Sequence, residues 1–280
     1  MIQLSLVVTT LILASLFITI GSWIFYGKVF KIKNISITTA LKATLIIILF
    51  YIACIPAIVL LKKSGLYSPP INIIFSIAQI VCSLIIVKFV LKTNILHTIG
   101  IQIFSISLSV VFALFIKSYV IKAYIAPSGS MAPTIIPGDY ILNNKFIYRF
   151  ISPQRGDVIV CKSPKNSNPF IERIVAIGGD KIEIRNKILF INNEQIEEIY
   201  TTHSDPRVFE KTSNPRDNFG PITIPTNEFF LLGDNRDNSY DSRFWGSIPL
   251  NDIYGKVFTI YWSKNPTTQQ TRVSRIGTTL

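Results

Sequence analysis

The sequence predicts a multi-pass α-helical membrane anchor with four spans, followed by a mainly-β domain exported to the outer face of the membrane. Of the 280 residues, 49% are hydrophobic, which is too apolar for an ordinary soluble domain. All 16 acidic residues lie at or after Asp139, whereas the preceding part carries only basic charges between apolar runs. The later part consists of short β-branched and aromatic segments separated by turn residues.

Four apolar stretches have the length of about 20 residues that a bilayer requires of a helix. They run approximately from Ile2 to Phe25, Leu41 to Leu61, Ile71 to Leu91 and Leu96 to Ile116. The first stretch lacks a basic start and is longer than the apolar core of a cleavable leader, so we expect a retained span. Residues 1–118 are therefore predicted to form the anchor.

The lysines of the short connections predict the orientation, because basic residues accumulate on the cytoplasmic side. The first connection is flanked by Lys28, Lys31, Lys33 and Lys42, the third by Lys88 and Lys92, and the second by Lys62 and Lys63. The first and third connections are therefore expected inside. Four spans then place the N-terminus and everything after Lys117 on the outer face.

Residues 119–265 have the size of one domain, and their segments favour strands over helices. The predicted strands are Tyr140 to Leu142, Asp157 to Cys161, Ile171 to Ile177, Lys181 to Ile184, Ile188 to Ile191, Phe229 to Leu232 and Lys256 to Trp262. Ser204 to Asn218 is expected to be a polar loop. Residues 266–280 show no periodicity and are predicted to be a poorly ordered tail.

Composition also argues against several functions. The net charge of +12 does not indicate nucleic-acid binding, because the chain has no basic helix, zinc pattern or aromatic RNA-binding motif. No cluster of metal ligands is evident, so no metal or other cofactor is expected. Cys161 is the one cysteine of the polar half, which excludes a disulfide within that domain.

The segment APSGSMAPTIIPGDYIL, from Ala126 to Leu142, follows the last span closely. Ser128 and Ser130 flank one glycine in it, which indicates a tight turn that displays both hydroxyls. A nucleophilic serine needs a rigid turn whose backbone N–H groups face the developing oxyanion. By composition alone, a Ser/Gly/Pro linker would be the favoured interpretation.

Three further segments follow in order: RGDVIV (155–160), FIERIVAIGGDKI (170–182) and FLLGDNRDNSYDSRFWGSIP (230–249). Together with SGSMAPT they resemble the ordered sequence boxes of type I signal peptidases, the bacterial leader peptidases that use a Ser/Lys dyad. The resemblance covers nearly the whole polar half. It implies that the exported domain is catalytic and hydrolyses peptides at the membrane surface without a cofactor.

The resemblance also implies roles for individual residues. Ser130 matches the nucleophile that forms the acyl-enzyme, and Ser128 matches the residue whose hydroxyl joins the Ser130 N–H in binding the oxyanion. Ser239 matches the serine that positions the general base. A supporting polar network is matched by Asp234, Arg236, Asp241 and Arg243. Because Asp-rich and Asn-rich loops form turns by themselves, we expect these four to support the site rather than take part in the chemistry.

Glu172 occupies the position at which the family has its general-base lysine, with Arg173 following as expected. Burial removes the proton from a lysine, but it keeps a carboxyl protonated and so unable to accept a proton. Loss of one member of a nucleophile and base pair lowers turnover by about 10⁴ to 10⁶. Strand alternation places Arg173 on the opposite face from Glu172, so Arg173 is not expected to replace the base.

Other residues offer no clear substitute for this lysine. Lys145, Lys162 and Lys181 are expected to be solvated surface charges. His203 lies in the loop THSDPR, far in sequence from the matching position, and His97 is expected at a span terminus on the other side of the membrane.

The sequence therefore predicts a membrane-bound serine endopeptidase that removes N-terminal signal peptides from exported preproteins through an acyl-enzyme on Ser130. A catalytically impaired homologue, which binds signal peptides or preproteins without cleaving them, remains open because of Glu172. A transporter is disfavoured, because the predicted spans contain no acidic residue. The expected partners are signal peptides and membrane lipid, and the expected location is a bacterial-type inner membrane with the C-terminal domain on the periplasmic or extracytoplasmic face.

Overall fold

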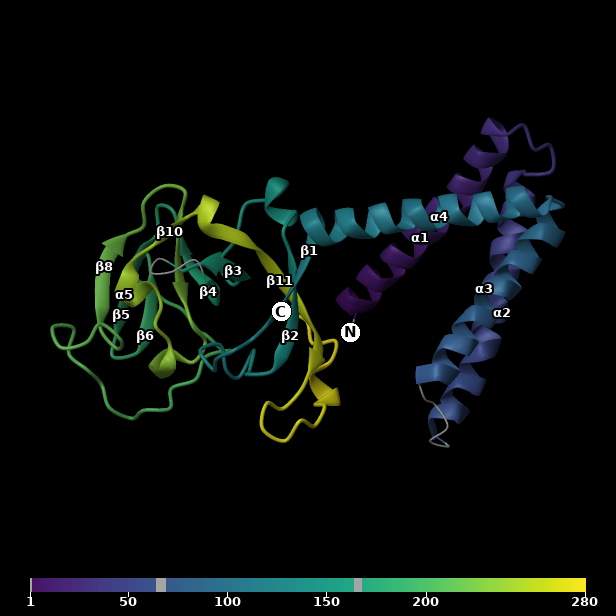
Figure 1. Ribbon diagram of the computed structural model, residues 1–280. Coiled ribbons are helices and arrows are strands. Elements are labelled where there is room, and N and C mark those ends of the chain that lie inside the picture. The colour runs from purple at the N-terminus through teal and green to yellow at the C-terminus, as the bar shows by residue number, and fades with distance from the viewer. Residues whose placement is uncertain (1, 64–68, 164–167) are drawn as a thin grey trace. The chain divides into compact units, whose positions relative to one another are not determined.

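The computed structural model describes residues 2–63, 69–163 and 168–280 (Figure 1). It divides into a helical unit, Val7–Phe115, and a second unit that comprises the β domain, Ile116–Leu280, and the first residues up to Leu6; we call the second the β unit. Long apolar runs form the helices. Asp139–Asn144 and Lys181–Arg185 show the alternating burial of a sheet with one buried face, whereas Val158–Lys162 and Glu228–Leu232 are buried along most of their length.

Four helices make up the helical unit: α1 (Ile2–Val29), α2 (Ile37–Lys63), α3 (Pro69–Leu91) and α4 (Ile95–Phe115). Trp23, Ala40, Val87 and Ile101 are buried where these helices pack together. Many other apolar side chains face outward, and Phe17 is 80% exposed. Large apolar side chains on the outer surface of a helical unit suit contact with lipid.

Two apolar segments of the described residues are long enough to cross a membrane, Ile37–Cys54 with 18 residues and Ile95–Val120 with 26. The apolar helices Leu13–Val29 and Ile77–Leu91 are shorter. Length and composition thus support a membrane anchor for two segments of the chain and leave four spans as a prediction.

The β unit contains two antiparallel sheets. The seven-stranded sheet has the order β1-β2-β11-β3-β4-β9-β10, and the four-stranded sheet has the order β7-β6-β5-β8. The strands of the larger sheet are β1 (Ile121–Ile125), β2 (Asp139–Asn144), β3 (Val158–Lys162), β4 (Pro169–Ile177), β9 (Glu228–Leu232), β10 (Ile248–Pro249) and β11 (Ile253–Ser263). Those of the smaller sheet are β5 (Lys181–Arg185), β6 (Ile188–Ile191), β7 (Glu194–Gln195) and β8 (Phe219–Thr223), and a short helix, α5 (Ser242–Trp245), follows β9.

Two buried clusters position the site. One cluster joins the two sheets, with Val175 and Phe230 from the larger sheet against Ile184 and Leu189 from the smaller. The other lies beneath the connection between β1 and β2 and is formed by Ala126, Met131, Ile135, Ile141, Val158, Val160, Val257 and Ile260. The second cluster holds the connection between β1 and β2 against the larger sheet.

All seven strands predicted from the sequence occur, each within three residues of its predicted bounds. The prediction for residues 266–280 is wrong, because this tail folds back onto the β unit. Thr279 forms a bridge with Thr259, and Thr271 forms a bridge with Lys264. Leu280 packs against the cluster beneath the β1–β2 connection. Long-range side-chain contacts order this tail, and such contacts leave no periodic pattern in the sequence.

Candidate active site

The two candidate serines lie on the connection from β1 to β2. The backbone N–H of Ala126 donates to the Asp139 carbonyl at 2.8 Å, which closes the base of this connection. Met131 and Ile135 are 2% and 0% exposed and point into the core. Because these two apolar side chains fix the connection from below, Ser130 is held on its outer side, where it is half-buried.

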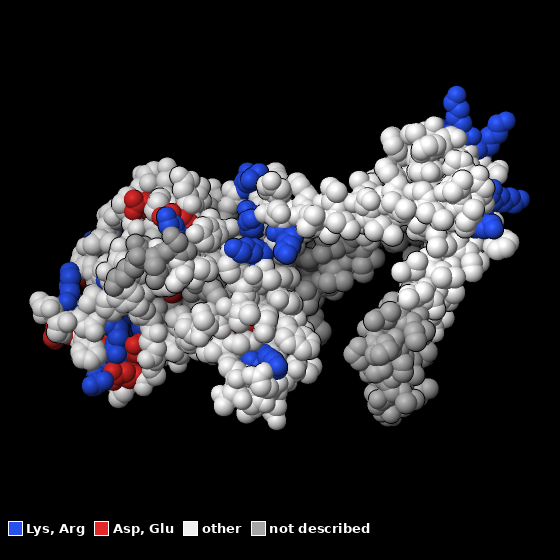
Figure 2. All heavy atoms as spheres, in the orientation of Figure 1, with Lys and Arg blue, Asp and Glu red and all other residues white. Residues whose placement is uncertain are grey.

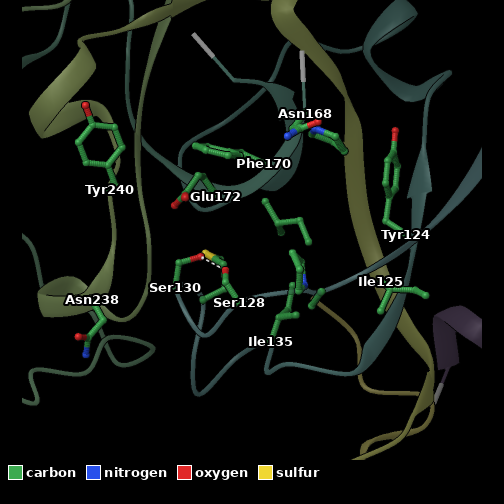
Figure 3. A pocket seen from close by; sticks show the side chains of 15 residues that line it. Tyr124, Ile125, Ser128, Ser130, Ile135, Asn168, Phe170, Glu172, Asn238 and Tyr240 are labelled. Carbon is green, nitrogen blue, oxygen red and sulfur yellow. Dashed lines mark hydrogen bonds between the residues drawn. The ribbon is translucent and has the colours of Figure 1, made fainter. Parts of the chain in front are cut away.

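The hydroxyl oxygens of Ser128 and Ser130 lie 3.3 Å apart and face a common pocket (Figure 3). The pocket has a volume of about 570 Å³. Its other walls are Tyr124, Ile125, Ala126, Pro127, Met131, Ile135, Asn168, Pro169, Phe170, Ile171, Glu172, Asn238 and Tyr240. This arrangement presents two hydroxyls to a mostly apolar cavity, which suits attack on a bound chain with small apolar side chains.

A second contact fixes the Ser130 backbone from the segment that follows β9. The Asn235 N–H donates to the Ser130 carbonyl at 2.9 Å, and the Asn235 side-chain amide donates to the Gly129 carbonyl at 3.1 Å. A Cβ at Gly233 would lie 2.6 Å from the Ser130 carbonyl oxygen, so this approach requires glycine. The backbone that carries Ser130 is therefore restrained from two sides.

Glu172 reaches the same pocket from β4, and in Figure 3 its carboxyl is directed toward the side of the pocket that holds Ser130. The side chain is nearly inaccessible, with the residue 3% exposed. Burial raises the pKa of Glu172 well above its ordinary value, and the carboxylate of Asp241 raises it further, against the lowering effect of Arg243. Burial therefore shifts this carboxyl toward its neutral form.

Two buried side-chain oxygens of candidate site residues lack hydrogen-bond partners among the described residues. They are the Oε2 of Glu172 and the Oγ of Ser239. Ser239 is 7% exposed and packs against Gly233, beneath the serine-bearing turn. An unsatisfied buried polar group lowers the free energy of unfolding by about 1 to 3 kcal/mol. These two atoms therefore mark a locally destabilised part of the candidate site.

The four residues of the predicted network lie together beneath this region, at 0% to 4% exposure. Arg243 pairs with Asp241 at 2.7 Å and donates to the Arg236 carbonyl at the same distance. Arg236 pairs with Glu198 at 2.6 Å. Every charge of the network thus has a partner of opposite sign, which buried charges require.

Asp234 connects this network to the serine-bearing turn. It accepts from Arg173 at 2.8 and 2.7 Å and from the Thr134 hydroxyl at 2.5 Å. The guanidinium of Arg173 also lies 3.9 Å from the ring centre of Tyr200, a cation–π contact. Arg173 is therefore engaged with Asp234 and Tyr200, and it does not line the pocket.

Sequence reasoning missed Thr134, Glu198, Tyr200 and Asn235. The segment 194–201 offers no motif, and its contacts with Arg173 and Arg236 depend on the folding of distant strands. Thr134 and Asn235 lie within two of the quoted motif segments. The motifs therefore placed both residues near the site, but they did not predict their hydrogen bonds.

None of the lysines and histidines considered as substitute bases is among the described residues that line the pocket. Lys145 donates to the Ser118 carbonyl at 2.5 Å, and Lys181 donates to Asn193 at 3.4 Å. Lys162 is exposed at the end of β3. His203 lies 3.6 Å from Asp237 in the polar loop region. Among the described residues that line the pocket, Glu172 is the one with a carboxyl, amine or imidazole group.

Comparison with known proteins agrees with this geometry. A family model described as signal peptidase, peptidase S26 matches residues 74–262. This chain belongs to that family. A signal peptidase I from Leptolyngbya laminosa is 37% identical over 169 residues, covering 58% of this chain and 78% of the relative.

Two further matches fall in the same peptidase family. A signal peptidase I from Aquifex aeolicus is 34% identical over 214 residues, covering 58% of this chain and 84% of the relative. The crystal structure of a signal peptidase I from Enterococcus faecalis is 31% identical, with a TM-score of 0.32, and the match covers 38% of this chain and 97% of that one. Glu172 lines the same pocket as Ser130, so any mechanism for this chain has to accommodate its buried carboxyl.

Proposed function

We propose that this chain is a membrane-bound serine endopeptidase that removes N-terminal signal peptides from exported preproteins, with Ser130 as the nucleophile. The observation that carries the proposal is the turn that directs Ser128 and Ser130 into one apolar pocket, in a chain of the signal peptidase family. The pocket walls favour a bound segment with small apolar side chains, the kind of residue found at a leader cleavage site.

In the proposed reaction, the Ser130 oxygen attacks the carbonyl carbon of the scissile peptide. The Ser130 proton passes to the ionised Glu172 carboxylate, while the Ser130 N–H and the Ser128 hydroxyl donate to the oxygen that becomes negative. The same proton is then transferred to the nitrogen of the scissile bond, so that the C–N bond breaks, the amine of the mature protein leaves and the acyl-enzyme forms. Water then hydrolyses the ester and restores the Ser130 hydroxyl. The hydrogen bonds from Asn235 to this backbone keep the donors in place before substrate arrives.

Glu172 sets the limit on this reaction. Only the ionised carboxylate can accept the Ser130 proton, and burial favours the neutral acid. We therefore propose a slow peptidase whose active form is the minor, ionised form of Glu172. We propose that Ser239 supports this form, as its resemblance to the serine that positions the base implies; its buried hydroxyl has no partner among the described residues.

Cleavage of a preprotein tests the proposal. The purified full-length chain in detergent is compared with Ser130→Ala and Glu172→Lys, and Arg185→Ala serves as a control, since Arg185 is exposed and pairs with Glu183 in the smaller sheet. We expect slow cleavage by the native chain and by the control, and none by Ser130→Ala. General base catalysis contributes roughly 10² to 10⁴ in rate, so Glu172→Lys should be faster by about 10²-fold or more.

Equal inactivity of the native chain and Ser130→Ala, with activity in Glu172→Lys, would show that the native chain binds without cleaving. Inactivity of all forms, with the control folded, would remove the assignment of Ser130. The two results separate a missing base from a wrong nucleophile.

We also propose that residues 1–118 anchor the chain through four spans in a bacterial-type inner membrane, with the domain of residues 119–265 on the outer face. The lysines of the first and third connections gather at one end of the helical unit on the face seen in Figure 2, which supports a shared cytoplasmic side. Signal peptides and lipid are then the partners, and nucleic acid is not.

Labelling in intact cells tests this orientation. Single cysteines are placed at Lys31 and at Val208, which are both exposed, in a chain whose native cysteines are replaced by serine. An impermeant maleimide should label position 208 before lysis and position 31 only after lysis. The reverse order would exclude the proposed location of the peptidase domain.

A further inference from the structure

The C-terminal segment from Lys264 to Leu280 lies against the connection that carries Ser130, although it follows the region matched by the family model, residues 74–262. A short 3₁₀ turn at Val273–Arg275 directs two arginines toward this connection. We call residues 264–280 the C-terminal clasp.

Arg275 makes the closest contacts of the clasp. Its Nη2 donates to the Thr134 carbonyl at 2.8 Å and to Asp139 at 2.6 Å, while its Nε lies 3.0 Å from both Asp139 oxygens. Arg272 donates to the Pro137 carbonyl at 2.7 Å and to the Ser263 hydroxyl at 2.8 Å. Guanidinium groups hold carboxylate and carbonyl oxygens in fixed directions, which a single amine does not.

Asp139 is the acceptor on which these contacts converge. It is 0% exposed, and it also accepts from the Ile136 N–H at 2.9 Å and the Ser263 hydroxyl at 2.6 Å. A buried carboxylate requires compensating donors. Arg272 and Arg275 are its two ion-pair partners among the described residues, so the clasp supplies the positive charge.

These contacts continue to the nucleophile through a short path. Thr134 receives Arg275 on its carbonyl and donates its hydroxyl to Asp234. The Ile135 N–H donates to the carbonyl of Met131 at 2.9 Å, and Met131 is the residue that follows Ser130. The turn is thus held at Thr134 by two contacts, one from Arg275 of the clasp to the carbonyl and one from the hydroxyl to Asp234.

We infer that Arg275, with Arg272, is a positioning residue for Ser130, and that the C-terminal clasp is a working part of the catalytic domain. The expected effect of Arg275 on the cleavage rate rests on the proposed function, whereas its expected effect on the order of segment 126–139 does not. A clasp that acted only on global stability would affect all strands equally.

Gly138 provides independent support for this close approach. It has a φ of +85°, and a Cβ there would collide with the Lys264 carbonyl oxygen and lie 3.2 Å from the Arg272 Nη2. Only glycine adopts this conformation without strain and leaves room for the clasp.

Hydrogen exchange of the full-length chain in detergent tests the structural part. Arg275→Gln is compared with Arg275→Lys and with Val273→Ala, a control at a position in the clasp that is 73% exposed. The measured quantity is the exchange rate of the segment 126–139 relative to that of 181–195 in the smaller sheet.

We expect this ratio to rise about tenfold in Arg275→Gln, because local opening exposes amides that global stability otherwise protects. A partial rise is expected in Arg275→Lys and none in Val273→Ala. If Arg275→Gln unfolds the whole domain, the exchange ratio of Arg275→Lys is compared with that of the native chain instead. An unchanged ratio in both Arg275 variants overturns the inference.

Cleavage kinetics in the Glu172→Lys background test the catalytic part. Misplacement of a reacting group by about 1 Å can cost 10²-fold in rate. Arg275→Gln should therefore lower kcat by about 10- to 100-fold and change KM less than twofold, with partial recovery in Arg275→Lys. A rise in KM with kcat unchanged would overturn the assignment to Ser130 positioning. If the native chain proves inert while the exchange ratio rises, the clasp stands and the proposed function fails.

Discussion

Replacing Arg173 by methionine should destabilise the β unit strongly, because it leaves a buried carboxylate without its cation. Asp234 is 0% exposed and pairs with Arg173 at 2.7 Å, where the arginine side chain is 9% exposed. The Thr134 hydroxyl would remain as a neutral donor. Removing one partner of such a pair costs about 3 to 5 kcal/mol, and the lost contact of the guanidinium with Tyr200 adds to this.

The thiol of Cys161 provides the measurement, because it is 0% exposed in β3 and reacts only when the strand opens. With Cys54 and Cys82 replaced by serine in the full chain, its labelling rate reports the free energy of opening. Since about 1.4 kcal/mol corresponds to a factor of ten, Arg173→Met should accelerate labelling by two to three and a half orders of magnitude.

A matched control is Arg185→Met, which breaks an exposed pair with Glu183 whose arginine side chain is 52% exposed. Exposed pairs contribute about 0 to 1 kcal/mol, so its labelling rate should change less than about fivefold. If the two substitutions accelerated Cys161 labelling equally, burial of the ion pair would not determine how much stability its loss costs, and the reasoning would be refuted.

Three other changes test the electrostatics and packing of the site. Because burial raises the pKa of Glu172 in the folded chain, stability is full below its ordinary pKa and falls as the pH rises through the raised value, by about 1.4 kcal/mol per pH unit. Glu172→Gln should remove this fall in pH-dependent urea unfolding, and an unchanged slope would contradict the buried acid. Gly138→Ala should lower the unfolding temperature and speed exchange of 126–139, since its φ is +85°; an unaltered exchange rate would argue against the close approach. Ser242→Ala should lower the free energy of unfolding by about 1 to 3 kcal/mol, because the Ser242 hydroxyl accepts from the Leu231 N–H at 2.9 Å. Ser239→Ala should lower it by less than about 0.5 kcal/mol, since the Ser239 hydroxyl has no partner among the described residues. Equal losses of stability in denaturant unfolding would contradict this difference.

The strands were predictable because each combines β-branched or aromatic residues with turn residues at its ends, as in the segment Ile188–Ile191 between two turns. The strand Ile121–Ile125 was missed, since it follows an apolar helix and its alternation extends over five residues only. The strand Phe219–Thr223 contains Gly220 and Pro221, which argue against a strand in any reading by local preference.

The candidate site was predictable only as far as the motifs extend. The motifs placed Ser128, Ser130 and Glu172 together, and the three line one pocket. They gave no indication of Arg275, which contacts Asp139 across 136 positions of sequence. A tail with scattered threonines and arginines has the composition of a disordered segment until the buried carboxylate it neutralises is known.

The surroundings of Glu172 favour a carboxyl group in its protonated form, because burial raises its pKa. Arg173 is paired with Asp234 and Arg243 with Asp241. Arg243 therefore lowers the pKa of Glu172 less than burial and the Asp241 carboxylate raise it. Such a site favours a neutral group, which a lysine satisfies as the amine and a glutamate as the acid. A neutral amine can accept a proton from a serine hydroxyl, whereas a neutral carboxylic acid is a donor and has to ionise before it can accept one. If Glu172 is the base, as proposed above, we expect cleavage by the native chain to depend on the ionisation of this carboxyl.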